Sequence, residues 1–250
     1  MNNKSAELIE VFSSVQGEGM FVGLRQAFIR FSGCNLTCDY CDTGDLKAPQ
    51  HCLMEATPGR RDFFPQANPV GLERITMLLE GWCRGWPGVH HSISLTGGEP
   101  LLRQDVLKEW LPQLRSILPI YLETNGIPHE TLGTVIDQID YISMDIKLPS
   151  TSGQANLWDC HRRFIEIAAR KNLFVKVVVG ETTQDWEIIR SCEIIAEVGK
   201  NIPLIIQPVT AKDGSVAVTP LKVIELQETA ARYLDEVRII PQTHKFLGVI

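Results

Sequence analysis

Apolar positions along the chain follow two spacings that alternate in a regular order. Short runs of apolar and β-branched residues are typical of strands, whereas apolar residues three and four positions apart are typical of helices. The series predicts helices at 72–79, 106–118, 132–139, 157–170, 186–198 and 221–234, and strands at 91–95, 120–122, 141–146, 174–179, 204–206 and 237–240. Strands that alternate with helices of about ten or more residues indicate parallel βαβ units with right-handed crossovers.

Two further strands precede this series, at 7–12 and 26–31, separated by a loop at 13–19 that contains two glycines. About six βαβ units can form either an open doubly wound sheet or a partial barrel. No G-x-G-x-x-G sequence follows an early strand, so a dinucleotide-binding Rossmann fold would lack its phosphate loop. We therefore predict an α/β protein with a partial (β/α)6-type TIM barrel, in which strand 7–12 is an N-terminal extension.

The stretch from Thr43 to Pro69 loses this periodicity and contains four prolines. We predict that residues 45–68 form an irregular insertion, because loops of this length are usually functional or mobile. The chain has no internal repeat, no low-complexity tract and no linker that would divide it. Its 250 residues are therefore predicted to form a single domain, as α/β barrels of this size do.

The composition points to a globular protein that acts on a small molecule. The hydrophobic content of 44% and the charged content of 22% are ordinary, and no apolar run approaches the about 18 residues that cross a bilayer. A net charge of -6 lacks the basic footprint of a nucleic-acid partner. The polar N-terminus has no signal-peptide pattern and the seven cysteines are odd in number, so we expect a cytoplasmic protein without disulfides.

Three of the cysteines, Cys34, Cys38 and Cys41, are spaced C-x3-C-x2-C. Thiolates this close together suit a polynuclear iron site, and three of them leave one metal position without a protein ligand. A zinc knuckle would need a fourth ligand, and the nearest candidates, His51 and Cys52, are about ten residues away. Spacing alone leaves an iron-sulfur cluster, a zinc site and coincidence open.

Polar residues follow several predicted strands, at the ends where a parallel barrel builds its site. They are Thr96-Gly97-Gly98-Glu99-Pro100, Glu123-Thr124-Asn125-Gly126, Gln207-Pro208-Val209-Thr210 and, at period two in strand 141–146, Ser143, Asp145 and Lys147. Each has a simpler interpretation as a turn, a helix cap or a buried ion pair. Their convergence on the edge that also holds the cysteines favours a binding site.

In strand 26–31, alternation places Phe28 and Arg30 on one face and Ala27, Ile29 and Phe31 on the other. Arg30 stands four residues before the first cysteine. A salt bridge at the rim and an anion-binding role both remain open for it.

The cysteine motif, together with the Gly97-Gly98-Glu99-Pro100 sequence, resembles the radical S-adenosylmethionine superfamily. The resemblance implies a 4Fe-4S cluster on Cys34, Cys38 and Cys41, with S-adenosylmethionine chelating the fourth iron. Cleavage of its sulfonium by one electron would give a 5′-deoxyadenosyl radical that abstracts hydrogen from a substrate held in the barrel. The implied S-adenosylmethionine contacts are Tyr40, Cys41, Asp42, Gly98, Glu99, Ser143, Met144, Asp145, Gln207, Pro208, Val209 and Thr210.

Features at both ends of the chain resemble one family within this superfamily, the 7-carboxy-7-deazaguanine synthases. They are Ser14-Val15-Gln16-Gly17-Glu18-Gly19, Arg30, Cys41-Asp42-Thr43 and the segment from Gln242 to Ile250, so the resemblance spans essentially the whole chain. It implies a carbon-nitrogen lyase that converts 6-carboxy-5,6,7,8-tetrahydropterin to 7-carboxy-7-deazaguanine with loss of ammonia. This reaction is a step toward queuosine and other 7-deazapurines.

The same resemblance implies the substrate contacts. Arg30 would pair with the substrate carboxylate, a charge-assisted contact whose fork geometry favours arginine over lysine. Gln16, with Val15 and Gly17 of its loop, would bind the amide edge of the pterin, and Thr96 would contact the ring.

Further implied features concern the metal, the tail and the partners. Thr43 would offer its hydroxyl to Mg²⁺, a hard cation that prefers oxygen ligands. The tail would fold into the site, with His244 and the terminal carboxylate of Ile250 touching substrate. The family often ends in proline, whereas this chain ends in Ile250. This departure matters little if the carboxylate is what binds. Family precedent also suggests a homodimer and an electron donor such as flavodoxin.

Two other functions are compatible with a cysteine motif of this kind. An enzyme that activates a glycyl-radical partner commonly has extra cluster cysteines, but Cys52, Cys83, Cys160 and Cys192 show no such spacing. A non-catalytic zinc or iron-sulfur binding module is the second rival. Neither accounts for Gln16, Arg30 and the His244 tail together.

Overall fold

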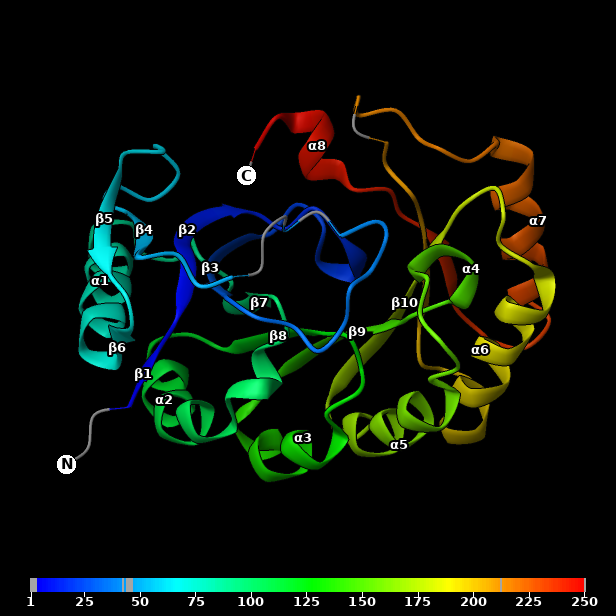
Figure 1. Ribbon diagram of the computed structural model, residues 1–250, viewed down its shortest axis with the longest axis horizontal. Helices are drawn as coiled ribbons and strands as arrows, with labels where there is room; N and C mark the ends of the chain where they lie inside the picture. Colours follow the sequence, from blue (N-terminus) through cyan, green and yellow to red (C-terminus); the bar gives the residue numbers. More distant parts are fainter. Residues whose placement is uncertain (1–3, 42, 44–46, 212, 250) are drawn as a thin grey trace.

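The molecule is built on one large sheet, most of whose strands run parallel. The computed structural model describes residues 4–41, 43, 47–211 and 213–249. Within this part of the chain, ten strands form a sheet in the order β12-β11-β10-β9-β8-β7-β3-β2-β4-β5 (Figure 1). A separate short ladder pairs β1 (Ser5–Ala6) with β6 (Val70–Gly71).

Seven strands lie parallel to one another and alternate with helices. They are β3 (Arg25–Phe31), β7 (Ser92–Gly97), β8 (Ile120–Thr124), β9 (Tyr141–Ile146), β10 (Asn172–Val179), β11 (Leu204–Pro208) and β12 (Val237–Ile239). The connecting helices are α1 (Leu72–Gly85), α2 (Gln104–Ile117), α3 (His129–Val135), α5 (Trp158–Ala168), α6 (Asp185–Val198) and α7 (Pro220–Ala230), with α4 (Pro149–Ser152) as a single turn. The predicted partial (β/α)6-type barrel is confirmed, and β12 is a short addition to it.

The helices form the outside of the barrel. Figure 1 shows α2, α3 and α5 along one side and α6 and α7 at the adjoining edge, with the tail helix α8 (Thr243–Leu247) on the opposite side of the sheet. The helix predicted at 72–79 continues to Gly85, six residues further. Among the described helices, none is both long enough and apolar enough to cross a membrane.

The N-terminal extension strand is present but longer than predicted. β2 (Leu8–Val15) runs antiparallel to β3, and residues 13–15 continue the ladder opposite residues 25–27. The prediction that the loop begins at residue 13 is therefore wrong. Ser13 and Ser14 lack the apolar signal of a strand, yet both are buried, and the Ser13 hydroxyl lies in a 2.7 Å hydrogen bond with Nε2 of His90.

The segment 45–68 is not irregular throughout, so that prediction is wrong for two stretches. β4 (His51–Glu55) pairs in parallel with β2, and β5 (Phe63–Ala67) pairs antiparallel with β4. Pro65 argued against a strand, but β5 is the last strand of the sheet, where proline removes no ladder bond. The buried carboxylate of Glu55 closes the hairpin by accepting the N–H groups of Gly59 and Arg61 at 2.9 and 2.7 Å.

Side chains alternate between the two faces of the parallel strands, and this separates the core from the cavity. On the outer face, apolar side chains such as Leu95, Leu122 and Val177 pack beneath the helices in one hydrophobic cluster. On the inner face, Tyr121 and Phe174 form part of a second, smaller cluster. Two residues further along these strands the inner side chains are Glu123 and Lys176, so the C-terminal end of the barrel is polar.

Candidate active site

A cavity of about 200 Å³ lies at the C-terminal ends of the parallel strands. Most residues predicted to form the site line it, namely Val15, Gln16, Gly17, Arg30, Cys34, Cys38, Tyr40, Cys41, Thr43, Thr96, Gly98, Ser143, Asp145, Gln207, Pro208, Val209, Thr210 and His244. Asp42 and Ile250 lie outside the described residues.

The cysteine loop follows β3 and presents its thiols to the cavity. Sγ of Cys34 accepts the N–H of Leu36 at 3.4 Å and the side-chain amide of Asn125 at 3.7 Å. Asn125 also donates to Asn35 Oδ1 at 2.8 Å, so the end of β8 holds the loop in place. Burial raises the pKa of the Cys34 and Cys38 thiols, and binding to a metal requires the deprotonated form.

The arrangement of the thiols suits a polynuclear cluster. All seven cysteines are free. In the described part of the chain, no three His, Cys, Asp or Glu side chains converge closely enough to bind a single ion. A 4Fe-4S cluster meets each thiolate through a different iron, so its ligands need not converge on one point. Cys34, Cys38 and Cys41 therefore fit such a cluster, with one iron left for another ligand.

The glycine pair after β7 packs against the start of the cysteine loop. Gly98 donates its N–H to the carbonyl of Phe31 and Glu99 to that of Gly33, both at 2.9 Å. A Cβ atom on Gly98 would collide with the Gly33 carbonyl, and Gly97 has a φ of +108°, which disfavours other residues. The glycines were predicted to allow close approach to a ligand, and they also allow two loops of the site to touch.

Two residues predicted to contact S-adenosylmethionine have side chains that point away from the cavity. The fully buried carboxylate of Glu99 accepts the N–H groups of Leu101 and Asn125 at 3.1 and 2.7 Å and the hydroxyl of Thr124 at 3.0 Å. It joins the ends of β7 and β8, and burial raises its pKa to about 7. Met144 lies in the hydrophobic core because alternation along β9 turns it to the outer face.

The ends of β9 and β11 place polar side chains at the cavity. Asp145 and Lys147 form a 2.8 Å ion pair, and Lys147 Nζ lies 5.2 Å from the ring centre of Tyr40. The side-chain oxygen of Gln207 is buried and, within the described residues, has no hydrogen-bond partner. An unpaired buried amide oxygen costs free energy, so a polar ligand is expected beside it. These groups fit the amino-acid and nucleoside parts of S-adenosylmethionine.

Arg30 forms an ion pair at the rim and also lines the cavity. Its Nε donates to Glu10 Oε1 at 2.7 Å across the β2–β3 ladder. Its guanidinium carbon lies 5.4 Å from the ring centre of Phe12, which in turn stacks on Phe28 with centroids 4.9 Å apart. A guanidinium above two stacked rings forms a wall suited to a flat, anionic heterocycle.

Gln16 and Thr96 both hydrogen-bond to Glu123, at the inner face of β8. Gln16 Nε2 donates to Glu123 Oε1 at 2.8 Å and to Gln26 Oε1 at 2.9 Å, and Thr96 Oγ1 donates to Glu123 Oε2 at 2.6 Å. The side-chain oxygen of Gln16 accepts the N–H of Glu18 at 3.0 Å. Burial, reinforced by the Glu18 carboxylate, raises the pKa of Glu123. The Gln16 amide is thus engaged within the protein, and Glu123 is the acceptor that it holds at the cavity.

The loop that contains Gln16 is fixed by a short turn, η1 (Gly19–Phe21), inserted into the barrel. The ring of Phe21 lies 4.8 Å from that of Tyr141 and 5.3 Å from that of Tyr121, measured between centroids. Gly19 has a φ of +65° and lies against Phe174, so a larger residue would not fit there.

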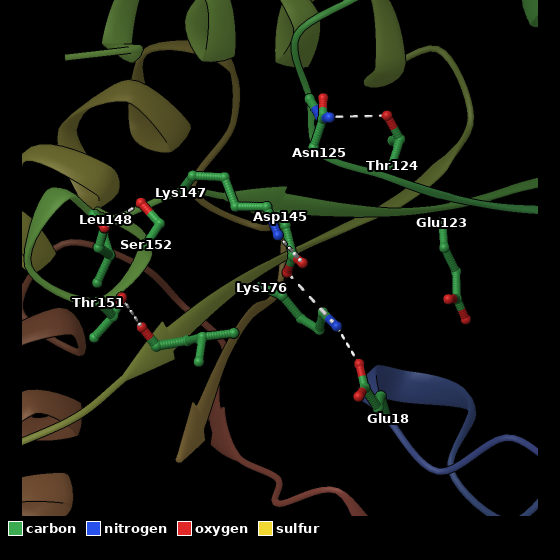
Figure 2. A network of polar contacts seen from close by, with 12 residues as sticks. Glu18, Glu123, Thr124, Asn125, Asp145, Lys147, Leu148, Thr151, Ser152 and Lys176 are labelled. Atoms are coloured by element: carbon green, nitrogen blue, oxygen red, sulfur yellow. Dashed lines mark hydrogen bonds and ion pairs between the residues drawn. The ribbon is translucent and has the colours of Figure 1, made fainter. Parts of the chain in front are cut away.

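Four groups of alternating charge lie in a row along the cavity, from Lys147 through Asp145 and Lys176 to Glu18 (Figure 2). Nζ of Lys176 is 3.6 Å from Asp145 Oδ1 and pairs directly with the carboxylate of Glu18. Burial opposes the charged lysine, but the Asp145, Glu18 and Glu123 carboxylates together outweigh it and raise the pKa of Lys176 well above its usual range. Burial also opposes ionised Glu18, yet Lys176 lowers its pKa to about 2, so both are charged at neutral pH.

The C-terminal tail closes one side of the cavity. Thr243, the first residue of α8, donates its N–H and its hydroxyl to the carbonyl of Gly17 at 2.8 and 3.2 Å. Gln242 donates to Glu18 Oε1 at 2.6 Å, and the His244 ring occupies the space that a side chain at position 17 would need. The predicted folding of the tail into the site is confirmed for these residues.

Four charged residues of the cavity had no role assigned from the sequence: Glu18, Glu123, Lys147 and Lys176. Lys176 could have been found, since a lysine inside the apolar run 174–179 is out of place in a buried strand unless it is paired. Glu123 stood among the polar strand ends, but nothing local distinguishes it from a turn residue.

Comparison with known proteins agrees with this geometry. Residues 28–201 match the family model described as "Radical SAM superfamily". The 7-carboxy-7-deazaguanine synthase of Geobacter sulfurreducens is 63% identical over 99% of both chains, and that of Methanothermobacter thermautotrophicus is 35% identical over 98% of both.

Among solved structures, QueE from Escherichia coli has a TM-score of 0.51 at 17% identity, covering 95% of this chain and 94% of that one. Streptococcus suis SuiB has a TM-score of 0.54 at 15% identity, covering 84% of this chain and 47% of that one. These two similarities show the fold alone. From the family model and the close relatives, the chain belongs to the radical S-adenosylmethionine superfamily and, within it, to the 7-carboxy-7-deazaguanine synthase family.

Proposed function

We propose that the protein is a radical S-adenosylmethionine carbon-nitrogen lyase that converts 6-carboxy-5,6,7,8-tetrahydropterin to 7-carboxy-7-deazaguanine with loss of ammonia. Relatives that match it over nearly their whole length bear the name of this activity. The observation that best supports the proposal is that one cavity is lined both by the three thiols and by Arg30 and Glu123.

As a member of its superfamily, the protein uses a 4Fe-4S cluster and S-adenosylmethionine. Cys34, Cys38 and Cys41 would hold the cluster, and when bound these groups supply a 5′-deoxyadenosyl radical for hydrogen abstraction. The chain's own part is to hold cofactor and substrate in a fixed relation and to exclude quenchers. The proposed S-adenosylmethionine contacts are Tyr40, Cys41, Gly98, Ser143, Asp145, Gln207, Pro208, Val209 and Thr210.

Substrate recognition follows from the charges of the cavity. The aminopyrimidinone edge of a pterin presents N–H donors, and Glu123 presents acceptor oxygens already oriented by Gln16 and Thr96. Arg30 would bind the carboxylate of the substrate. Gln16 and Thr96 therefore act chiefly by orienting Glu123.

Several finer assignments belong to the proposal as well. Thr43, whose hydroxyl donates to the carbonyl of Gly97 at 3.4 Å, would offer an oxygen ligand to Mg²⁺. His244 would contact the substrate from the tail. A homodimer, a flavodoxin-type electron donor and a cytoplasmic location remain predictions from the family resemblance.

The test is anaerobic incubation of the reconstituted, reduced enzyme with S-adenosylmethionine and 6-carboxytetrahydropterin, followed by mass analysis. We expect 7-carboxy-7-deazaguanine, ammonia and 5′-deoxyadenosine. Cys38→Ala should lack the cluster and form no product, whereas Cys83→Ala, which alters a half-buried thiol on α1, should behave as wild type. Cleavage of S-adenosylmethionine without conversion of the pterin would favour an activating enzyme instead.

A further inference from the structure

Lys176 is the most unusual charge in the barrel. It lies in the middle of β10, among valines, and its side chain is 9% exposed. A buried ammonium is stable only when it is paired and hydrogen-bonded. Lys176 donates a hydrogen bond to Glu18, in the loop after β2, and forms a longer ion pair of 3.6 Å with Asp145 on the neighbouring strand. Within the described residues, Oδ1 of Asp145 has no hydrogen-bond partner.

Each inner member of the charged row is shared between two partners. Asp145 pairs with Lys147 at 2.8 Å and with Lys176 at 3.6 Å, and Lys176 pairs with Asp145 and Glu18 (Figure 2). Glu18 in turn accepts Gln242 at 2.6 Å. If another cation pairs with Asp145, the interaction between Asp145 and Lys176 weakens. The interaction between Lys176 and Glu18 then becomes stronger.

The two carboxylates that pair with Lys176 lie in different functional parts of the cavity. Asp145 belongs to β9, among the proposed S-adenosylmethionine contacts. Glu18 belongs to the loop that holds Gln16, and Gln242 directly precedes the tail helix that bonds to Gly17. Lys176 is the residue that joins the two parts.

We propose that Lys176 is a positioning residue that couples S-adenosylmethionine binding to closure of the substrate loop and the C-terminal tail. This inference rests on the proposed function. The cofactor has one permanently cationic group, its sulfonium. A cation that approaches Asp145 competes with Lys176 for that carboxylate, so Lys176 turns its charge more fully to Glu18. When the Glu18 carboxylate is fixed more rigidly by Lys176, it also fixes Gln242. The tail is then held more tightly over the substrate.

Coupling of this kind is reciprocal, and it can therefore be measured by binding. The experiment uses the reconstituted holoenzyme with its cluster oxidised, so that S-adenosylmethionine binds without being cleaved. The Kd of S-adenosylmethionine is measured by equilibrium dialysis with and without saturating 6-carboxytetrahydropterin. We expect the substrate to tighten cofactor binding by at least about 5-fold in wild type and by less than about 2-fold in Lys176→Met.

Two further variants separate coupling from simple loss of structure. Glu18→Gln/Lys176→Met removes charge from both partners, so it folds even if Lys176→Met alone leaves too much buried negative charge. Lys222→Met is the matched control, because Lys222 also pairs with an aspartate, Asp185 at 3.1 Å, but lies on the helical exterior. We expect the double variant to lack coupling and the control to keep it.

A second measurement needs no pterin. Addition of S-adenosylmethionine alone should slow amide hydrogen exchange in residues 243–249 of the wild type and of Lys222→Met, but not in the folded Lys176 variants. A purely structural lysine would change stability without removing this response. Wild-type exchange that does not respond to the cofactor, or coupling retained without Lys176, would overturn the inference. A wild type that shows the response yet forms no 7-carboxy-7-deazaguanine would instead refute the proposed reaction.

Discussion

Glu10 accepts a 2.7 Å hydrogen bond from Nε of Arg30, directly across the β2–β3 ladder. The bond fixes the guanidinium through the one nitrogen nearest its stem, and the remaining nitrogens form the fork that suits a carboxylate. Phe12 supports the guanidinium from one side. The ion pair at the rim and an anion site in the cavity are therefore compatible, because they use different nitrogens of one side chain.

Replacing Arg30 with lysine should weaken substrate binding while cofactor chemistry persists. Arg30→Lys keeps the charge but loses the fork, a change that we expect to cost about 2 kcal/mol, or roughly 30-fold in substrate Kd. Cleavage of S-adenosylmethionine in the absence of substrate should be unchanged. The matched control is Arg115→Lys, because Arg115 bonds to Asp140 on the exterior at 2.7 Å. Unchanged substrate affinity in Arg30→Lys would count against the carboxylate role.

A methyl group at position 98 should separate the glycine turn from the cysteine loop. The added Cβ would collide with the Gly33 carbonyl, and backbone on both sides would have to move. We expect Gly98→Ala to lose about 3 kcal/mol of unfolding free energy and to bind iron poorly. Gly81→Ala is the control, since a Cβ there meets nothing within 4 Å in an exposed part of α1. Thermal unfolding should show that Gly81→Ala raises the free energy of unfolding by about 0.5 to 1 kcal/mol, which is the difference in helix propensity between glycine and alanine.

Local patterns in the sequence predicted the parts of the site that depend on alternation along one strand. Period two placed Phe28 and Arg30 of β3 at the cavity and Ala27, Ile29 and Phe31 in the core, as the structure has them. The same rule, applied to β9, would have excluded Met144. Its inclusion came from family precedent, which does not distinguish backbone from side-chain contacts.

Contacts between distant segments were beyond such patterns. Gln16 is 107 residues from Glu123, and Lys176 is 158 residues from Glu18, so no local signal could pair them. The hairpin of β4 and β5 was missed for a related reason. Its stability comes from pairing with β2 and from Glu55, which bonds to Ser13 at 2.9 Å as well as to its own turn.

Stability should fall as the pH drops from about 6.5 toward 4. His90 is buried against Trp82, and burial, followed by the Arg25 charge, lowers its pKa from 6.5 to about 4. Between these two pKa values the folded state binds fewer protons than the unfolded state. The contribution of His90 is therefore complete above pH 6.5 and is lost progressively as the pH falls from 6.5 to about 4. The loss should be on the order of 3 kcal/mol.

Urea unfolding of the cluster-free protein between pH 4 and 7.5 measures this dependence. His90→Gln cannot take up a proton, so its unfolding free energy should vary less with pH than that of the wild type. A variant profile as steep as the wild-type profile would assign the slope to other groups.

Arg61 connects the β4–β5 hairpin to the C-terminal tail. Its backbone N–H is held by Glu55 at 2.7 Å, and its Nη2 donates to the carbonyl of Gly248 at 2.6 Å. An exposed hydrogen bond of this kind stabilises by about 1 kcal/mol, which is roughly fivefold in an opening equilibrium. Arg61→Ala should therefore speed amide hydrogen exchange in residues 243–249 by about fivefold, with little change in overall unfolding.

Product formation should fall by no more than this factor, because Thr243 and Gln242 still hold the other end of the tail. Arg60→Ala, in the same exposed turn, is the control and should leave exchange unchanged. If amide exchange in the tail were as slow in both variants as in the wild type, the hairpin would have no part in holding the tail. The bonds of Gln242 and Thr243 alone would then account for its position.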